Sequence, residues 1–516
     1  MNNNTNNTRV AKNTLLLYLR MFFSVLVGLY TSRIVINTLG INDYGIYNIV
    51  GGIITMLAFL NSAMTASSQR FISYELGRNN KEKLRDVFST SIIIHLIIAL
   101  LVLLLAETFG LWFLNNKINI PENRMYAANW VYQCSIFSFI LMVISVPYNA
   151  CIVAHEHMNA FAYISILEMF LKLIIVYLLH LFDSDKLILY AIFLFIVALI
   201  IRFIYVDYCK RRFTECIFSC NFNKRLFRKM SSFAGWSLVG NLGFALKDQG
   251  SNIVLNMFYG VALNAARGIA LQVNSVVSYF FSSFLMAINP QITKQFAQGN
   301  IKESISLVYR ACKFSLFLVS IIAIPLMINI DYVLSLWLGV VPVYTSEFLF
   351  YALWVAIINS MTGPLVTAIQ ATGHIMLFQI TIFIIMALEM PIAYIILKCG
   401  FQPHYIMIGS LLITFIGLIV RFLLLRNLIH EYNTSYFLIK IVFKNILIVL
   451  CCYILSFYIR NTLSDSFLAF IFSSIISFVI TVLFIYWIGI TKNERTFLSN
   501  KFVLCFSKIY NRIRIN

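Results

Sequence analysis

Charged side chains are scarce in this sequence. Only 11% of its 516 residues are Asp, Glu, Lys or Arg, whereas 60% are hydrophobic. A soluble protein needs a polar shell around its core, and this composition cannot supply one. The scarcity of charge therefore excludes a soluble globular protein and indicates a chain that lies in a membrane.

Acidic residues are scarcer than basic ones, with 20 Asp and Glu against 39 Lys and Arg, which leaves a formal net charge of +19. A strong positive charge is also typical of nucleic-acid-binding proteins. Here, however, the Lys and Arg residues lie between apolar runs rather than on a basic face interleaved with aromatic residues. We therefore expect no nucleic acid among the partners.

The ten cysteines are scattered along the chain, without the spacing of a zinc site or of an extracellular disulfide framework. Cys216 and Cys220 lie four residues apart, but no His accompanies them, so a pair of plain thiols is the simpler interpretation. We expect no metal site and no cofactor.

Long apolar runs fill most of the sequence. A membrane-spanning helix needs about 20 mostly apolar residues, and we count about fourteen such runs. The first follows the polar start MNNNTNNTRVAKN and is longer than a signal-peptide core, so we expect it to be retained as a spanning helix. The predicted fold class is all-α and integral to the membrane.

Basic residues cluster in three segments between or after these runs. Because Lys and Arg are retained on the cytoplasmic side of a membrane, these segments predict that both termini are cytoplasmic. The clusters comprise Arg70, Arg78, Lys81, Lys83 and Arg85; Lys210, Arg211, Arg212, Lys224, Arg225, Arg228 and Lys229; and Lys492, Arg495, Lys501, Lys508, Arg512 and Arg514.

An internal repeat organises the chain. SRIVIN at 32–37 returns as SNIVLN at 251–256, and NNKE at 79–82 returns as NIKE at 300–303. Chance similarity between apolar helices is the alternative, but the matched residues include Asn, Ser, Lys and Glu. Six predicted spans separate the copies, so the copies enter the membrane in the same orientation. The predicted domains are an N-lobe at 1–208, a basic cytoplasmic linker at 209–231, a C-lobe at 232–430, two further helices at 431–490 and a basic cytoplasmic tail at 491–516.

Cations inside predicted spans are the first candidates for function, because a charge at the bilayer centre costs at least a few kcal/mol. Lys247 lies midway along the run 232–258, too far from either end to reach the lipid surface. Arg33 and Arg267 lie on the first two spans of the repeats, where parallel-repeat transporters have a central cleft. The predicted cleft is cationic and suits phosphate or carboxylate. For Arg33, snorkelling toward lipid head groups is the alternative.

Amides and two carboxylates complete the candidate set. Asn241, Asn252 and Asn274 are predicted substrate-binding residues, and Asn252 suits sugar hydroxyls; contacts between helices are the alternative role for such residues. Asp248 and Glu168 are the candidates for ion coupling. Glu168 also lies four residues before Lys172, so an ion pair within one helix is the favoured interpretation there.

A motif follows the first span. The pattern Leu-Gly-x-x-x-Tyr-Gly-x-Tyr occurs at Leu39, Gly40, Tyr44, Gly45 and Tyr47, and YGVALNAARG at 259–268 is its degenerate echo. Together with the span count and the basic segment after the sixth span, it resembles the polysaccharide transporters of the MATE-like multidrug/oligosaccharidyl-lipid/polysaccharide (MOP) exporter superfamily. Within that superfamily, the chain looks like the bacterial O-antigen and capsule repeat-unit flippases.

The resemblance implies a two-lobed, V-shaped fold in the bacterial cytoplasmic membrane. It implies that the chain carries undecaprenyl-diphosphate-linked oligosaccharide from the inner to the outer leaflet, driven by a proton or sodium gradient. Membrane lipids and glycan-assembly proteins are the further partners that we expect. The cationic cavity residues of the family map onto Arg33, Lys247 and Arg267.

Two other functions are weighed against the flippase. A cation-drug exporter of the same fold would want carboxylates in its cleft, and only Asp248 qualifies against three cations. A membrane glycan polymerase or ligase would need paired carboxylates or a sizeable outer loop, and the predicted outer loops are short. We therefore predict a transporter and not an enzyme.

Overall fold

The computed structural model describes most of the chain, and its described part is helical. The described residues are 3–55, 58–117, 120–217, 223–259, 261–338, 341–429, 431–464, 466–492 and 494–496. No strand occurs within these ranges, which confirms the all-α fold class. Eleven helices of the described part are long and apolar enough to cross a membrane, so a multi-pass membrane protein is confirmed. The count of fourteen spans stays a prediction.

The chain forms two compact units, each assembled from separate segments. Unit 1 comprises Met1–Gln249, Ser282–Val308 and Val366–Leu388, and unit 2 comprises Gly250–Phe281, Tyr309–Leu365 and Glu389–Asn516. Unit 1 therefore contains parts of both predicted lobes, 1–208 and 232–430. The lobe boundaries themselves stay a prediction.

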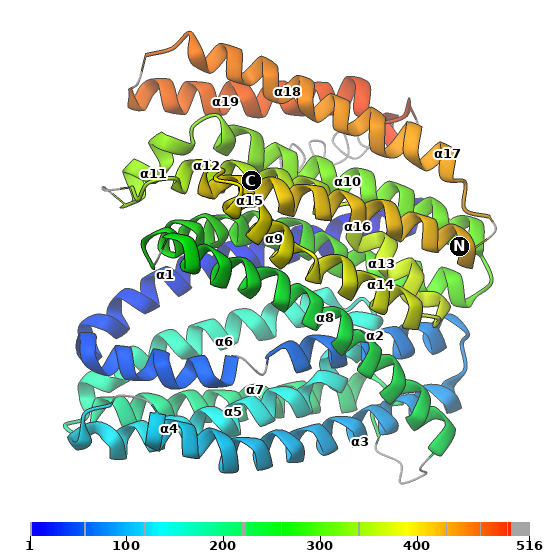
Figure 1. Ribbon diagram of the computed structural model, residues 1–516. Coiled ribbons are helices and arrows are strands. Elements are labelled where there is room, and N and C mark those ends of the chain that lie inside the picture. The colour runs from blue at the N-terminus through cyan, green and yellow to red at the C-terminus, as the bar shows by residue number, and fades with distance from the viewer. Residues whose placement is uncertain are drawn as a thin grey trace, which may run out of the picture. The chain divides into compact units, whose positions relative to one another are not determined.

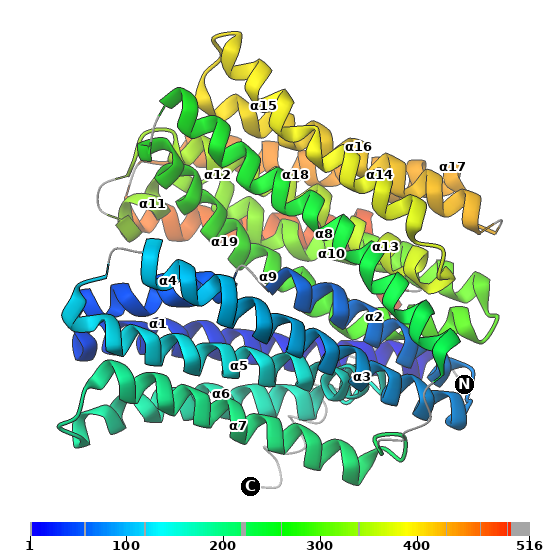
Figure 2. The same ribbon diagram turned by 60° about the horizontal axis from the view of Figure 1, so that its bottom comes forward.

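Unit 1 begins with seven consecutive helices, shown in blue to green in Figures 1 and 2. They are α1 (Asn3–Thr55), α2 (Ala58–Gly77), α3 (Lys81–Leu105), α4 (Leu111–Lys117), α5 (Glu122–Ala154), α6 (Met158–Leu178) and α7 (Lys186–Arg212). Parts of α8 (Lys224–Tyr259), α9 (Val261–Ala297), α10 (Ile301–Met327) and α13 (Thr362–Thr372) join them, with α14 (Met376–Ala387).

Helix α5 is the centre of unit 1, because it packs against α2, α3, α6 and α7. Its buried alanines allow neighbouring backbones to approach closely, which is how helices associate in lipid. Polar backbone is satisfied locally as well. In the wide helical turn at Ala106–Gly110, the carbonyl of Ala106 accepts from the N–H of Leu111, and the hydroxyl of Tyr132 on α5 also donates to it at 2.8 Å.

Unit 2 contains the remaining parts of α8, α9, α10 and α13. Its other helices are α11 (Ile330–Leu338), α12 (Thr345–Asn359), α15 (Glu389–Lys398), α16 (Ile406–Leu428), α17 (Thr434–Tyr436), α18 (Lys444–Asn461) and α19 (Phe467–Phe484). Helices α18 and α19 pack side by side (Figure 1). The buried residues of α19 are Ala469, Ser473, Ser477 and Thr481, a stripe of small side chains at every fourth position that leaves the larger residues for lipid.

Helix α1 breaks at Gly40, inside the Leu-Gly motif. The backbone of Gly40 has φ 80° and ψ 165°, which a glycine adopts freely but a residue with a Cβ adopts only under strain. The 53 residues of α1 are thus two helical segments that meet at this glycine. The break lies between the first predicted span, 14–38, and the second, 44–66.

Replacing Gly40 with Ala should destabilise the protein by roughly 1–3 kcal/mol, because the new residue must hold a strained backbone conformation. Steric room is not the limit, since nothing lies within 4 Å of a Cβ built at Gly40. Gly28→Ala is the matched control, because Gly28 has equally open surroundings in the same helix and has no such conformation. Thermal unfolding of the purified variants measures both changes. Equal unfolding midpoints for the two variants would contradict this account.

Candidate functional site

A buried arginine and an amide meet within unit 2. Arg267 on α9 is only 2% exposed, and its Nη1 donates a hydrogen bond to Oδ1 of Asn252 on α8. Helix α8 ends at Tyr259 and α9 begins at Val261, so the two residues lie on consecutive helices near their connection. The amide orients the guanidinium but carries no charge of its own. Of the predicted substrate-binding residues, Arg267 and Asn252 are thus brought into contact.

A buried carboxylate of α15 contacts α8 beside this pair. Ser251, the neighbour of Asn252 in sequence, donates from Oγ to Oε1 of Glu389 at 3.2 Å. Both side chains are 2% exposed. Glu389 begins α15, and the sequence alone gives it no role because a single Glu in an apolar run has no pattern. The geometry adds Glu389 to the polar groups of unit 2.

The residues of α8 that precede this segment belong to unit 1. Lys247 is buried, with 8% of its surface exposed, whereas the adjacent Asp248 is exposed, since neighbours on a helix point about 100° apart. Asn241 is half-buried and donates from Nδ2 to Oγ of Ser62 at 2.8 Å. This bond joins α8 to α2, so Asn241 makes the helix contact that was the alternative to a binding role.

The remaining predicted residues are Arg33, Asn274 and Glu168. The backbone of Arg33 belongs to α1, but its side chain lies outside the described residues. Asn274 on α9 is half-buried, and its Oδ1 is buried without a hydrogen-bond partner in the described part. Glu168 accepts from Nζ of Lys172 at 2.6 Å, and both side chains are more than a third exposed. The predicted ion pair within α6 is confirmed.

The motif after the first span is anchored by an ionic cluster. Nε of Arg124 on α5 donates to Oδ1 of Asp43 at 2.9 Å, and its Nη1 lies 2.5 Å from Oδ2 of Asp185, just before α7. Arg124 thus joins α1, α5 and the start of α7 at one end of unit 1, which we call the acidic end. Arg124 and Asp185 were not among the predicted site residues, because their partners are distant in sequence.

The environment of Asp185 gives the acidic end a pH dependence. Burial raises the pKa of this carboxyl, but hydrogen bonds from Arg124 and from the N–H groups of Ile188 and Leu187 outweigh burial and hold the pKa below its ordinary value. A group with a depressed pKa stabilises the fold above its unfolded-state pKa. Its contribution is lost as the pH falls through the lowered value.

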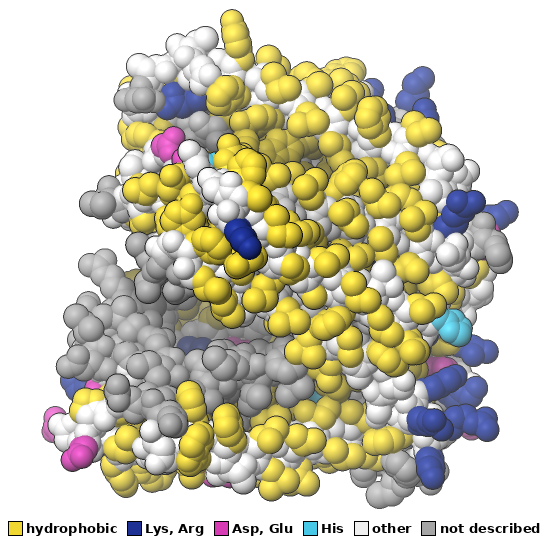
Figure 3. All heavy atoms as spheres, in the orientation of Figure 1, with side chains coloured by type: hydrophobic (Ala, Val, Ile, Leu, Met, Phe, Trp, Pro, Cys, Tyr) yellow, Lys and Arg dark blue, Asp and Glu magenta, His cyan; other side chains and the backbone are white. Residues whose placement is uncertain are grey.

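The opposite end of unit 1 is basic. Figure 3 shows Lys and Arg side chains gathered at the lower right, and acidic side chains at the lower left. The exposed basic residues include Lys81, Lys83 and Arg85 at the start of α3, Lys210, Arg211 and Arg212 at the end of α7, and Lys224, Arg225, Arg228 and Lys229 at the start of α8. The two basic clusters predicted from these segments thus lie at one end of the unit.

Glu156 is the central residue of a network at the basic end. It lies in the turn between α5 and α6 with φ 61°, unusual for a residue other than glycine, and its side chain is 4% exposed. Its carboxylate accepts from Nζ of Lys294 at 2.7 Å and from Nε2 of Gln291 at 3.1 Å. Nδ2 of Asn13 donates to its main-chain oxygen at 3.3 Å. The turn thus binds both α9 and α1.

Arg70, near the end of α2, forms the second part of this network. Its Nε donates to the carbonyl of Gln370 at 3.0 Å and its Nη2 to the carbonyl of Ala371 at 2.9 Å. The guanidinium also lies over the ring of Phe71 at 4.5 Å. Because helix carbonyls near a C-terminus are partly negative, Arg70 is well placed at the end of α13.

The network ties segments of the two predicted lobes to each other within unit 1. Arg70 and Glu156 lie in the predicted N-lobe, whereas Lys294 and Gln370 lie in the predicted C-lobe. Close packing reinforces these contacts, since a Cβ at Gly77 would lie 2.7 Å from the carbonyl oxygen of Lys294. A polar cavity of about 120 Å³ beside Arg70 has room for water. The basic end of unit 1 is therefore closed, but by polar contacts that water can replace.

Metal binding has no evident place among these groups. Within the described ranges, no three His, Cys, Asp or Glu side chains come together as a metal site requires.

Sequence comparison identifies a protein family and a curated membrane protein that are similar to this chain. The family described as "Polysaccharide biosynthesis protein" matches residues 10–296, more than half of the chain. The uncharacterized membrane protein EpsK of Bacillus subtilis (strain 168) is 19% identical over 319 residues, which are 61% of this chain and 63% of EpsK. The match thus spans less than two thirds of the length of that relative.

Solved structures of MATE transporters have the same fold. A crystal structure of MATE in the bent conformation gives a TM-score of 0.71 with 12% identity, over 82% of this chain and 96% of that chain. An outward-facing multidrug resistance MATE family transporter of the MOP superfamily gives 0.70 with 13% identity, over 82% and 95%. At such low identity the likeness establishes the fold.

Replacing Lys294 with Met should destabilise the protein by roughly 3 kcal/mol, because the Glu156 carboxylate would stay buried without its cation. Adding Glu156→Gln to Lys294→Met should recover most of this loss, since no charge is then left buried. Thermal unfolding of the purified proteins measures both effects. Lys302→Met is the matched control, because Lys302 is an exposed lysine at the start of α10. A double variant as unstable as the Lys294→Met single variant would contradict the ion-pair explanation.

Proposed function

Because the chain belongs to the polysaccharide biosynthesis protein family and has the fold of MATE transporters, we propose that it is a polysaccharide transporter of the MOP superfamily and acts as a flippase for lipid-linked oligosaccharide. Its substrate would be an oligosaccharide repeat unit on undecaprenyl diphosphate, moved across the bacterial cytoplasmic membrane by alternating access. Transporters of this superfamily are generally not enzymes, and the proposal includes no bond-breaking step.

The observation that carries the proposal is a pair of buried cations on membrane helices. Arg267 is 2% exposed and Lys247 is 8% exposed. Holding a cation in low dielectric costs free energy, and a diphosphate that binds such a residue recovers part of that cost. An arginine already oriented by Asn252 offers a fixed fork of N–H donors to phosphate oxygens. We infer that Lys247, Arg267 and Arg33 line the cavity that receives the head group.

The charge distribution supports a direction for transport. Lys and Arg are retained on the cytoplasmic side, so the basic end of unit 1 would face the cytoplasm, where lipid-linked repeat units are made. The contacts of Arg70 and Glu156 would then close the cytoplasmic entrance. Substrate entry requires that these contacts break, and an outward-open state requires that they re-form.

Energy coupling needs a carboxylate that can take up a proton or sodium ion. Of the two predicted candidates, Glu168 lies on α6, whereas Asp248 lies on α8 directly beside the buried Lys247, which is one of the proposed head-group ligands. We propose Asp248 as the coupling residue. An ion-coupled multidrug exporter of the same fold is the second candidate function, and the buried Glu389 is the observation that favours it.

Asn252→Asp should abolish the export of surface polysaccharide, because a carboxylate in contact with Arg267 would neutralise the cation that the substrate needs. Lys247→Ala and Arg267→Ala should also abolish export, and Glu at either position should be worse than Ala because it repels the diphosphate. The assay compares surface polysaccharide with the amount of protein in the membrane, in cells that lack the native gene.

Lys398→Ala is the matched control, because Lys398 is an exposed cation at the end of α15 and has no role in the proposed cavity. Its export should equal that of the unmodified protein. Normal export in Asn252→Asp, Lys247→Ala and Arg267→Ala alike, with normal protein level, would remove these residues from the mechanism.

A further inference from the structure

A second polar cavity lies entirely within unit 2. It occupies about 860 Å³ where α10 ends, α11 and α12 begin and α18 ends. That volume falls in the range of small-molecule sites, about 300–1,000 Å³. We name it the α11 cavity, and six of its lining residues carry the argument: Asp331, Glu347, Phe350, Tyr453, Phe457 and Arg460.

The hydrogen-bond donors of the α11 cavity are held in place. Nε of Arg460 donates to Oδ1 of Asn329 at 2.9 Å, and its Nη1 donates to the carbonyl of Leu463 at 3.3 Å. Asn329 is 2% exposed and also accepts from Oγ of Ser473 on α19 at 3.1 Å. The guanidinium is therefore oriented by a buried polar group rather than left to move in solvent.

Two carboxylates supply the acceptors. Asp331 begins α11 and Glu347 lies in the first turn of α12, so each stands at a helix start where negative charge is favourable. Both side chains are exposed. In the described part of the chain, no side-chain hydrogen bond or salt bridge engages either of them. Their oxygens are therefore available to a ligand.

Aromatic rings form one wall of the α11 cavity. Tyr453 lies 5.9 Å from Phe350 and 5.9 Å from Phe457, between ring centroids. Tyr453 and Phe457 belong to α18 and Phe350 belongs to α12, so residues of two helices form the wall. Such rings present broad faces that attract C–H groups, because the face of an aromatic ring is negative.

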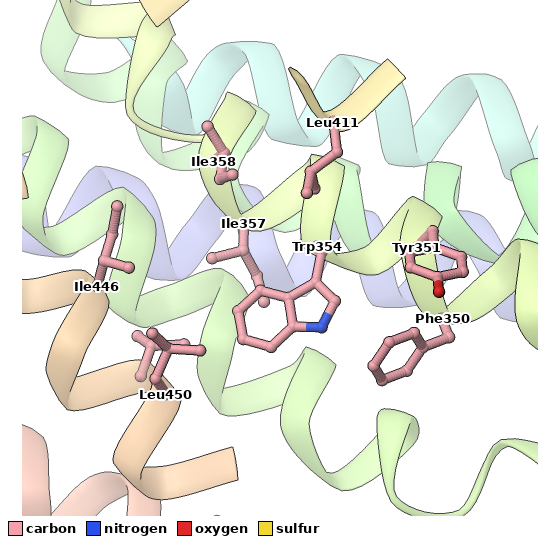
Figure 4. Close-up of a pocket in the computed structure, with 9 residues that line it drawn as sticks. Phe350, Tyr351, Trp354, Ile357, Ile358, Leu411, Ile446 and Leu450 are labelled. Carbon is pink, nitrogen blue, oxygen red and sulfur yellow. The ribbon is translucent and has the colours of Figure 1, made fainter. Parts of the chain in front are cut away.

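Beyond Phe350 and Tyr351, the wall continues into an apolar pocket of about 360 Å³. Phe350 and Tyr351 line both spaces. Figure 4 shows these two residues beside Trp354 on α12, with Ile446 and Leu450 of α18 across the pocket. Because no charged residue lines this pocket, a polar ligand is confined to the α11 cavity.

We propose that the α11 cavity binds a saccharide. The identity of this saccharide as part of the transported repeat unit rests on the proposed function. A pyranose ring has C–H groups on its faces, which stack on aromatic rings, and hydroxyls at its edge, which both donate and accept. The cavity offers the faces of Tyr453 and Phe457 and the acceptors of Asp331 and Glu347, and the guanidinium of Arg460 lies in its lining. An organic cation would need only the rings and the carboxylates, and Arg460 would repel it.

The test measures binding without transport. The probe is the set of soluble repeat-unit oligosaccharides obtained by mild acid hydrolysis of the surface polysaccharide of the source strain, titrated calorimetrically into the purified full-length chain in nanodiscs. Tyr453→Ala and Glu347→Gln should each raise the Kd about tenfold. Tyr453→Phe should keep the unmodified Kd, since the ring remains.

Tyr458→Ala is the matched control, because Tyr458 lies on α18 with 70% exposure and does not line the cavity; its Kd should be unchanged. Glu347→Gln keeps an exposed residue of the same size, so its result stands even if Tyr453→Ala fails to fold. An unmodified protein that binds no oligosaccharide, or an unchanged Kd in Glu347→Gln and in folded Tyr453→Ala, overturns the inference. Tetraphenylphosphonium binding that Glu347→Gln weakens, in place of saccharide binding, also overturns it.

The failure of this inference and the failure of the proposed function give different results. In one case, Glu347→Gln loses oligosaccharide binding and the unmodified chain moves no lipid-linked oligosaccharide. The α11 cavity then remains a saccharide site, and the flippase proposal is wrong. In the other case, the unmodified chain exports lipid-linked oligosaccharide but binds no soluble oligosaccharide. The flippase proposal then stands, and the saccharide site in the α11 cavity is wrong.

Discussion

The free energy of holding a cation inside a membrane-spanning helix bundle is the constraint on which this protein depends. Arg267 and Lys247 are almost fully buried on α9 and α8, in a chain with few charges. A hydrophobic residue at either place would be cheaper to insert. Unit 2 supports its arginine with the neutral amide of Asn252, which orients the guanidinium without cancelling its charge. Under the proposed function, this oriented guanidinium is the group that presents its N–H donors to the phosphate oxygens of an anionic ligand.

The basic end of unit 1 is held together by polar contacts between segments that are distant in sequence. Glu156 accepts from two residues of α9, and Arg70 donates to two carbonyls at the end of α13. These are polar contacts whose partners water can replace, and the apolar residues Phe71, Phe233 and Ile375 are buried in the core of the same unit. The left-handed backbone of Glu156 costs free energy that only these surrounding contacts sustain. Under the proposed function, these contacts would break and re-form as the chain passes between its two states.

The sequence predicts the helical class and several local features, because these depend on nearby residues. Apolar runs predict the spanning helices, the Leu-Gly motif coincides with the break at Gly40, and the spacing of Glu168 and Lys172 predicts their ion pair. Such local patterns cannot predict contacts between residues that are distant in the sequence. Glu156 and Lys294 are 138 residues apart, and Arg70 and Gln370 are 300 apart, so no local spacing connects them. The positive φ of Glu156 has no signal either, since glycine is the residue that predicts such a conformation.

Transport by the purified chain in proteoliposomes tests the central claim most directly. Vesicles would carry undecaprenyl-diphosphate-linked oligosaccharide with a labelled sugar, and a membrane-impermeant glycosidase would report the sugars on the outer face. The account predicts that the chain makes the whole pool accessible, that Arg267→Ala does not, and that a cationic dye is not moved. A chain that moves the dye and leaves the lipid-linked sugar in place would contradict the account.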